Sequence, residues 1–198
     1  MTEDLFIRLA LLGGMVMGVS ISATYRRRAA QVGGNVSNKT EGFARHLLLR
    51  ACGLIAFLSV VTYLIYPPAM SWSQFDLPPA LRFAGVAIVW TCLPAFYWTF
   101  RSLGNNVTGT VVTREAASLV TAGPYRWVRH PLYSMAMISW TGTCLATANG
   151  WIFFWIVTGF AILYRRTALE EAQLIERFGD AYRDYMRRTG RLVPRLVG

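Results

Sequence analysis

An uncharged run of about 34 residues, positions 131–164, constrains this chain more than any other feature. As a single helix it would be roughly 51 Å long at about 1.5 Å per residue, which exceeds a hydrocarbon core of about 30 Å. Asn149-Gly150 in its middle is a turn signal. We therefore expect a tight hairpin of two apolar helices, residues 132–148 and 151–164. Its arms, at roughly 16 residues, are short for a crossing, so the hairpin stops before the far surface or sits where the bilayer thins.

Three further apolar windows precede this hairpin. They cover residues 5–25, 47–66 and 81–100, and each has about the 20 residues that cross a hydrocarbon core. Composition agrees, since 54% of the 198 residues are hydrophobic and only 15% are charged, against roughly 25% charged in a soluble domain. We expect an all-α integral membrane protein, one domain with about five transmembrane helices.

The basic residues predict how this bundle is oriented. They gather in residues 25–45 and 101–130 and in the segment from residue 165 onward. The opposite connections, residues 67–80 and the Asn149-Gly150 turn, contain none. By the positive-inside rule, the N-terminus lies outside and the C-terminus lies in the cytoplasm. The net charge of +10 could also indicate nucleic-acid binding, but no fold signature for it accompanies the basic runs, so we expect no nucleic-acid partner.

The three cysteines predict no metal site. Cys52, Cys92 and Cys144 each fall inside an apolar window and lack the paired spacing of zinc ligands. We interpret them as small apolar packing residues.

The segment after residue 164 is too polar to be inserted in the membrane. Apolar side chains recur in it at helical spacing, at Ala168, Ala172, Ile175, Phe178, Tyr182, Tyr185 and Met186. Gly179-Asp180 predicts a break, with Asp180 capping a second short helix. We expect a cytosolic C-terminal amphipathic helix that emerges directly from the last crossing and folds against the cytoplasmic face.

The start of the hairpin carries unusual polar chemistry. Because a residue before proline avoids the helical region and proline favours the first helical position, His130 belongs at an N-cap and Pro131 at the first turn. Such a helix start attracts an anionic group such as a carboxylate, and Tyr133 points into the bundle or a cavity. The alternative is that the Arg and His side chains are interfacial anchors and Tyr133 is part of an aromatic belt.

The other end of the hairpin carries an opposite-charge pair. Arg166 and Glu170 are four residues apart, so they share a helix face and can pair. A surface ion pair worth about 0–1 kcal/mol is the alternative. Since both ends of an antiparallel hairpin meet on one side, we expect His130 to lie close to Glu170. Ionisable residues at a membrane boundary that face a cavity are candidates for function.

These residues resemble the signature of the isoprenylcysteine carboxyl methyltransferase and phospholipid methyltransferase family. The resemblance covers residues 103–195, about half of the chain. Its first part comprises Leu119, Val120, Thr121, Gly123, Pro124, Tyr125, Arg126, Arg129, His130, Pro131 and Tyr133. Its second part comprises Glu170, Glu171, Leu174, Phe178, Gly179, Tyr182, Tyr185, Leu192, Val193 and Pro194. The ordered set at this spacing is specific, whereas Arg-His-Pro alone would not be.

The resemblance implies a methyltransferase that uses S-adenosylmethionine and methylates a lipophilic or small acceptor. Residues 101–198 then form the methyltransferase core, with three transmembrane helices in residues 1–100. The implied cofactor contacts are Ala117, Ser118, Leu119, Val120, Tyr125, His130, Pro131, Leu132, Tyr133, Glu170 and Glu171. Arg166 and Glu170 are implied as the catalytic polar pair, with Arg166 binding the acceptor. Ala117-Ser118 departs from the family's pattern, in which a histidine is common.

The chemistry of the residues agrees with that implication. Glu170 or Glu171 suits the amino group of the cofactor, while His130 and the helix start suit its carboxylate. A carboxylate or thiolate acceptor needs no base, whereas an amine acceptor must lose a proton, for which Glu170 or His130 is the candidate. Prenylated cysteine, phosphatidylethanolamine, other lipid amines and small thiols all remain open as acceptors. We expect the acceptor to enter laterally from the lipid bilayer; no oligomeric state is predicted.

Two other functions remain as alternatives. A sterol-reductase-like oxidoreductase would bind NADPH in a related cytoplasmic cavity, but such enzymes have more crossings than this chain provides. A non-enzymatic protein that binds anionic lipid through a basic tail would have basic runs poor in glutamate. Glu170-Glu171 within the basic segment argues against it.

Overall fold

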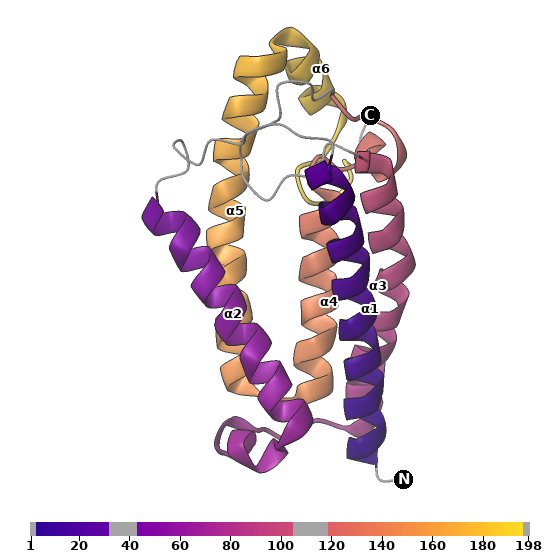
Figure 1. Cartoon of the computed structure of the whole chain (residues 1–198), viewed down its shortest axis with the longest axis vertical. Helices are drawn as coiled ribbons and strands as arrows, with labels where there is room; N and C mark the ends of the chain where they lie inside the picture. Colours follow the sequence, from indigo (N-terminus) through magenta and orange to yellow (C-terminus); the bar gives the residue numbers. More distant parts are fainter. Residues whose placement is uncertain (1–2, 32–42, 105–118, 196–198) are drawn as a thin grey trace.

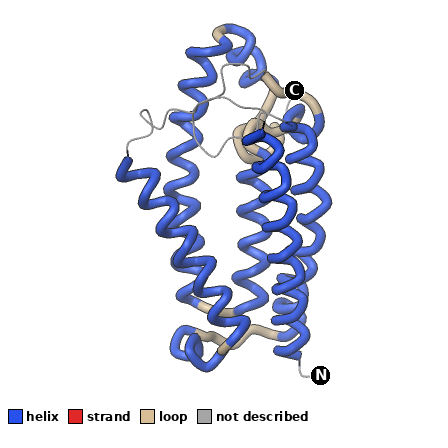
Figure 2. Tube along the Cα trace, in the orientation of Figure 1, coloured by secondary structure: helices blue, strands red, loops and turns tan. Residues whose placement is uncertain are grey.

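The computed structural model describes residues 3–31, 43–104 and 119–195. Over these residues it contains helices and connecting loops and no strand (Figure 2), which agrees with the expected all-α class. The helices in chain order are α1 (Glu3–Gln31), α2 (Phe43–Ile65), the 3₁₀ helix η2 (Pro67–Ser73), α3 (Pro79–Leu103), the 3₁₀ helix η4 (Gly123–Arg126), α4 (Pro131–Thr147), α5 (Gly150–Phe178) and α6 (Asp180–Arg188).

All five apolar windows are helical, and four of the helices are long and apolar enough to cross a membrane. These four are α1, α2 over Leu47–Ile65, α3 and α5. Their outward surfaces are apolar, with Leu9 and Val16 on α1 53% and 55% exposed. The fifth helix, α4, has 17 residues and runs beside α3 (Figure 1). The number of crossings stays a prediction.

The α4–α5 connection is a tight reversal at the predicted place. Ala148 adopts the left-handed conformation at φ 47°, and the Asn149 side chain accepts a hydrogen bond from Ile152 N at 3.1 Å. The same side chain, fully buried, donates to Met70 O at 2.9 Å. Asn149 is therefore both the N-cap of α5 and a link to η2. The arms are unequal, with 17 and 29 residues, because α5 continues past the apolar window.

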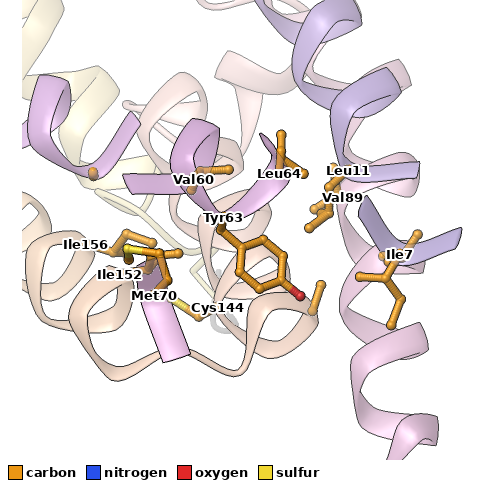
Figure 3. Close-up of a cluster of buried hydrophobic side chains, with 13 residues drawn as sticks. Ile7, Leu11, Val60, Tyr63, Leu64, Met70, Val89, Cys144, Ile152 and Ile156 are labelled. Atoms are coloured by element: carbon orange, nitrogen blue, oxygen red, sulfur yellow. The ribbon is translucent and has the colours of Figure 1, made fainter. Parts of the chain in front are cut away.

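Side chains from all five long helices meet near the end of the bundle that holds the N-terminus (Figure 1). Figure 3 shows Tyr63 of α2 among Ile7, Leu11, Val60, Leu64, Met70, Val89, Cys144, Ile152 and Ile156. Arg82 of α3 reaches the same region, donating to Tyr63 Oη at 3.0 Å and to Ala146 O at 3.2 Å. It also pairs with Asp4 of α1 at 2.7 Å, so the charged group is satisfied within the protein.

Cys52, Cys92 and Cys144 are buried and unbridged, as expected of packing residues.

Helix α4 is placed by its very close approach to α3. A Cβ at Gly85 would lie 2.5 Å from Gly142 O, and one at Gly142 would lie 2.7 Å from Gly85 O. Only glycine lets two helix backbones touch in this way, and such contacts are a common means of association in membranes. The second half of α4 is thereby held directly against the first part of α3.

Helix α5 runs without a break through Phe178, so the polar helix does emerge directly from the last apolar window. The predicted cap of the next helix is wrong: Gly179, not Asp180, occupies the N-cap of α6 and makes no side-chain cap. The reason is its φ of 54°, which glycine adopts without strain. Asp180 is the first helical residue and accepts from Arg183 at 2.8 Å.

Candidate functional site

A polar cluster forms where the start of α4 meets the second half of α5, at the end of the bundle opposite the N-terminus (Figure 1). His130 is the N-cap of α4 and Pro131 follows at the first turn, as predicted. The imidazole makes no cap bond, and the His130 carbonyl accepts from the backbone N–H groups of Tyr133 and Ser134 at 3.1 Å each. The side chain is only 7% exposed, so it lies inside the protein.

Three side chains converge on the Glu170 carboxylate. Tyr133 Oη donates to Oε1 at 2.6 Å, and Arg166 Nε donates to the same oxygen at 3.0 Å. His130 Nδ1 lies 3.4 Å from Oε2, and the His130 and Tyr133 rings stack with an interplanar angle of 3°. The expected Arg166–Glu170 pair and the expected proximity of His130 to Glu170 are both present. Tyr133 points toward α5, into the polar cluster.

Glu171 lies deeper and is held by two arginines. Arg129 Nε donates to its Oε1 at 2.7 Å, and Arg191 Nη2 donates to its Oε2 at 2.5 Å. The Arg129–Glu171 pair is almost dry, with side-chain exposures of 9% and 4%. His130 Nε2 lies 3.5 Å from Oε1 but does not meet hydrogen-bond geometry. Removing one partner of such a buried pair leaves an uncompensated charge, which costs about 3–5 kcal/mol.

The segment after α6 returns to the cluster and forms one of its walls. Its backbone pairs with the residues before α4: Arg129 N donates to Gly190 O at 2.9 Å and His130 N to Arg191 O at 3.1 Å. Arg129 also donates to the carbonyls of Met186 and Thr189. Sequence reasoning missed Arg129 and Arg191 as partners of Glu171. Their pairing joins positions 42 and 20 residues apart, for which the sequence has no local signal.

Three buried tyrosines from η4 and α6 support this wall. Tyr185 Oη donates to Tyr125 O at 2.6 Å, and the Tyr182 and Tyr185 rings lie 5.7 Å apart. Burial raises the pKa of Tyr185 to about 12 and also raises the pKa values of Tyr125 and Tyr182. All three phenols are therefore neutral at physiological pH, and of their bonds that of Tyr185 is described above.

The remaining predicted site residues are placed as follows. Leu119 and Val120 are half-buried in the irregular segment before η4, and Pro131 is buried. Leu132 packs against the small apolar cluster of Ala29 and Phe100. Ala117 and Ser118 lie outside the described residues.

Two buried polar atoms near Glu171 have no hydrogen-bond partner among the described residues, His130 Nε2 and Tyr182 Oη. Buried polar atoms are bonded in the great majority of cases, so each such atom needs an explanation. No group of three or more His, Cys, Asp or Glu side chains in the described part of the chain is placed to hold a metal ion.

Comparisons with known proteins are consistent with this geometry. A family model described as phospholipid methyltransferase matches residues 81–181, which includes α3 and so begins earlier than the motifs indicated. Over 92 residues the chain is 34% identical to methanethiol S-methyltransferase 1 of Bradyrhizobium diazoefficiens, covering 46% of this chain and 32% of that protein. Over 101 residues it is 33% identical to mouse (Mus musculus) protein-S-isoprenylcysteine O-methyltransferase, covering 48% and 35%. The chain thus spans about a third of the length of these relatives.

A solved structure resembles this chain over almost all of its length. The eukaryotic intramembrane Ras methyltransferase, isoprenylcysteine carboxyl methyltransferase, superimposes with a TM-score of 0.61 at 20% identity, covering 98% of this chain and 68% of that one. At this identity the likeness establishes a common membrane fold.

Proposed function

This chain belongs to the phospholipid methyltransferase family, and from that premise we propose that it transfers a methyl group from S-adenosylmethionine to a lipophilic or small acceptor. The observation that carries the proposal is the buried cluster in which Glu170 contacts Tyr133, Arg166 and His130. The relatives reported above bear the names of methyltransferases, which supports the reaction class. None of the relatives reported above bears the name of an NADPH-dependent reductase or of a non-enzymatic lipid-binding protein.

The residues present fit the groups that S-adenosylmethionine carries. Its sulfonium and ammonium are cations, which a carboxylate and an aromatic face stabilise; Glu170 and the Tyr133 ring provide both. Its carboxylate needs hydrogen-bond donors or a helix start, and His130 Nε2, Tyr182 Oη and the first turn of α4 are nearby. We assign Leu119, Val120, Tyr125, Pro131 and Leu132 to the surroundings of the cofactor, as the family pattern implies.

Within this proposal the two glutamates have different tasks. Glu170 is assigned to the cofactor, because its carboxylate meets one arginine together with the Tyr133 phenol and the His130 imidazole, whereas that of Glu171 meets two arginines. Glu171 is neutralised by Arg129 and Arg191, so it holds the residue before His130 and the C-terminal segment in place around the cofactor. Glu171 therefore completes the cofactor site by positioning its neighbours.

When bound, S-adenosylmethionine supplies an electrophilic methyl group, to which the acceptor's lone pair bonds while the carbon–sulfur bond breaks and its electrons stay on sulfur. Arg166 binds the head of the acceptor next to Glu170, and its positive charge suits an acidic head. Holding two reactants in line contributes about 7–11 kcal/mol to such a reaction, so positioning is the main task of the protein. A thiolate or carboxylate acceptor requires no base, whereas Glu170 or His130 Nδ1 would take the proton from an amine.

We propose that the cluster faces the cytoplasm. It lies at the end of the bundle where α1 finishes with Arg26, Arg27 and Arg28, as the positive-inside rule requires. Arg8 lies in the opposite half of α1, but its guanidinium is satisfied by Leu64 O at 2.8 Å. An acceptor dissolved in the bilayer then reaches the cluster sideways.

Calorimetric titration of the detergent-purified protein with S-adenosylmethionine and with NADPH tests the proposal. We expect saturable binding of S-adenosylmethionine alone, weakened at least tenfold by Glu170→Gln. Glu176→Gln, at an exposed position of α5, serves as the matched control and should bind like the unmodified protein. Binding of NADPH in place of S-adenosylmethionine, or of neither, would overturn the methyltransferase assignment.

A further inference from the structure

Two tyrosines and two arginines form a surface cluster where α1 and α3 end, on the side of the bundle that holds the polar cluster (Figure 1). Tyr25 and Arg28 belong to α1, and Tyr97 and Arg101 belong to α3. We refer to these four residues as the α1–α3 corner. The Tyr25 and Tyr97 rings lie 6.1 Å apart, edge to face. The corner is separate from the polar cluster, which is built around the start of α4, α5 and the segment after α6.

Each of the two helices presents its tyrosine first and its arginine one turn later. The spacing is three residues on α1 and four on α3, which places the tyrosine and the arginine of each helix on one face. Arg28 Cζ lies 5.8 Å from the centroid of the Tyr25 ring. The charges of Arg28 and Arg101 both act on the Tyr25 phenol. The two guanidinium groups therefore belong to one site, because both lie near the same side chain.

Neither arginine of the corner forms an ion pair with a carboxylate in the part of the chain that the structure describes. The acidic residues of α1, Glu3 and Asp4, lie at its other end, and α3 contains no acidic residue. In the polar cluster, by contrast, Arg129 and Arg166 each meet a glutamate. Both arginines of the corner are exposed, and two neighbouring cations without a counter-charge attract an anion.

The corner lies at the depth of lipid head groups. Tyr97 is eighteen residues after Pro79, the first residue of α3. This separation is roughly 27 Å at about 1.5 Å per residue, close to the thickness of a hydrocarbon core of about 30 Å. Tyrosine is enriched at the boundary of that core, and Tyr97 is 46% exposed. Arg101 lies about 6 Å farther along the helix, in the head-group region.

A packed apolar layer behind the corner holds it in shape. Phe100 is 2% exposed, and its ring stacks on that of Tyr25 with the centroids 5.6 Å apart. Ala29 is buried in the same layer, and Leu132 of α4 packs against it. Tyr25 is thereby fixed between α1 and α3, so the site loses little conformational entropy when it binds a ligand.

We infer that the α1–α3 corner binds the phosphate of an anionic phospholipid in the adjacent leaflet, with Arg28 and Arg101 contacting the phosphate and Tyr97 at the depth of the lipid carbonyl groups. Guanidinium groups bind phosphate through two parallel hydrogen bonds. Basic pockets between membrane helices are known to bind anionic head groups. An anionic lipid such as phosphatidylglycerol has no amine, thiol or carboxylate to methylate. It is therefore a second ligand, distinct from the methyl acceptor of the proposed reaction.

Native mass spectrometry of the detergent-purified protein, with equimolar dioleoyl phosphatidylglycerol and dioleoyl phosphatidylcholine, tests this site. We expect the first molecule of phosphatidylglycerol to bind at least tenfold more tightly than phosphatidylcholine. Arg28→Gln and Arg101→Gln should each weaken its binding about fivefold, which is the contribution of one basic residue beside an anionic lipid surface.

Arg26→Gln is the matched control. Arg26 is exposed in the same turn of α1, and its Nε donates to Ser22 Oγ at 3.1 Å, so the affinity for phosphatidylglycerol should change less than twofold. Equal affinities for the two lipids, an affinity unaffected by both corner variants, or an equal loss in Arg26→Gln would overturn the inference. So would displacement of phosphatidylglycerol by an equal concentration of inorganic phosphate, which would indicate a site for free phosphate. No methyl donor is present in this experiment, so its outcome is independent of the proposed function.

Discussion

Replacing Glu171 by glutamine should destabilise the protein far more than the same change at Glu170. Glu171→Gln removes the negative charge that faces Arg129, in a pair whose side chains are 9% and 4% exposed. An uncompensated charge at that depth costs about 3–5 kcal/mol. The second pair, with Arg191, adds little, because the arginine is 33% exposed and solvent screens it.

For a chain of about 200 residues, 1 kcal/mol shifts Tm by about 2–4 °C, so the expected loss is about 6–20 °C. Thermal unfolding in detergent, followed by circular dichroism, measures it. The Arg166–Glu170 pair is more exposed, at 15% and 13%, and its partners are four residues apart on one helix, so Glu170→Gln should shift Tm by less than half as much. Equal shifts, or a larger shift at Glu170, would refute the division into a positioning and a cofactor-binding glutamate.

Three further variants examine other parts of the account. Arg166→Ala should raise KM for the acceptor more than it weakens S-adenosylmethionine binding, and the reverse pattern in steady-state kinetics would exchange the roles of Arg166 and Glu170. Tyr182→Phe removes a buried hydroxyl without a partner among the described residues, so thermal stability should not fall. The affinity for S-adenosylmethionine, measured by calorimetry, should fall several-fold. A loss of stability with unchanged affinity would contradict this role. Gly142→Ala should lower the free energy of unfolding by about 1–3 kcal/mol in denaturant unfolding, because the added Cβ would lie 2.7 Å from Gly85 O. An unchanged denaturant midpoint would contradict this, because it would mean that α3 and α4 can move apart at no cost in free energy.

The parts of the fold that the sequence predicted are those governed by local rules. A proline after His130 places an N-cap, and an Asn-Gly pair in an uncharged run places a reversal. The four-residue spacing of Arg166 and Glu170 predicts their pairing, which the structure contains. The rule that aspartate favours the N-cap gave a wrong prediction at α6. There Gly179, which adopts a positive φ, is the N-cap, and Asp180 is the first helical residue.

Contacts between distant segments could not be predicted in this way. The return of residues 189–192 to the start of α4 depends on backbone hydrogen bonds, which leave no mark on residue identity. From the sequence, Arg191 is therefore interpreted as one more basic residue of the C-terminal segment, and Arg129 as a basic residue beside the membrane. In the structure both neutralise Glu171.

We propose methyl transfer at the cluster around Glu170. Its most direct test is a tritiated-methyl assay, in which the purified protein is incubated with labelled S-adenosylmethionine and with bilayer lipid extracts or prenylcysteine analogues. We expect label in an organic-phase product with the unmodified protein and at least tenfold less with Glu170→Gln, a difference of about 1.4 kcal/mol. Labelled product formed equally by both proteins would remove Glu170 from the site, and no product from any acceptor would contradict the assignment.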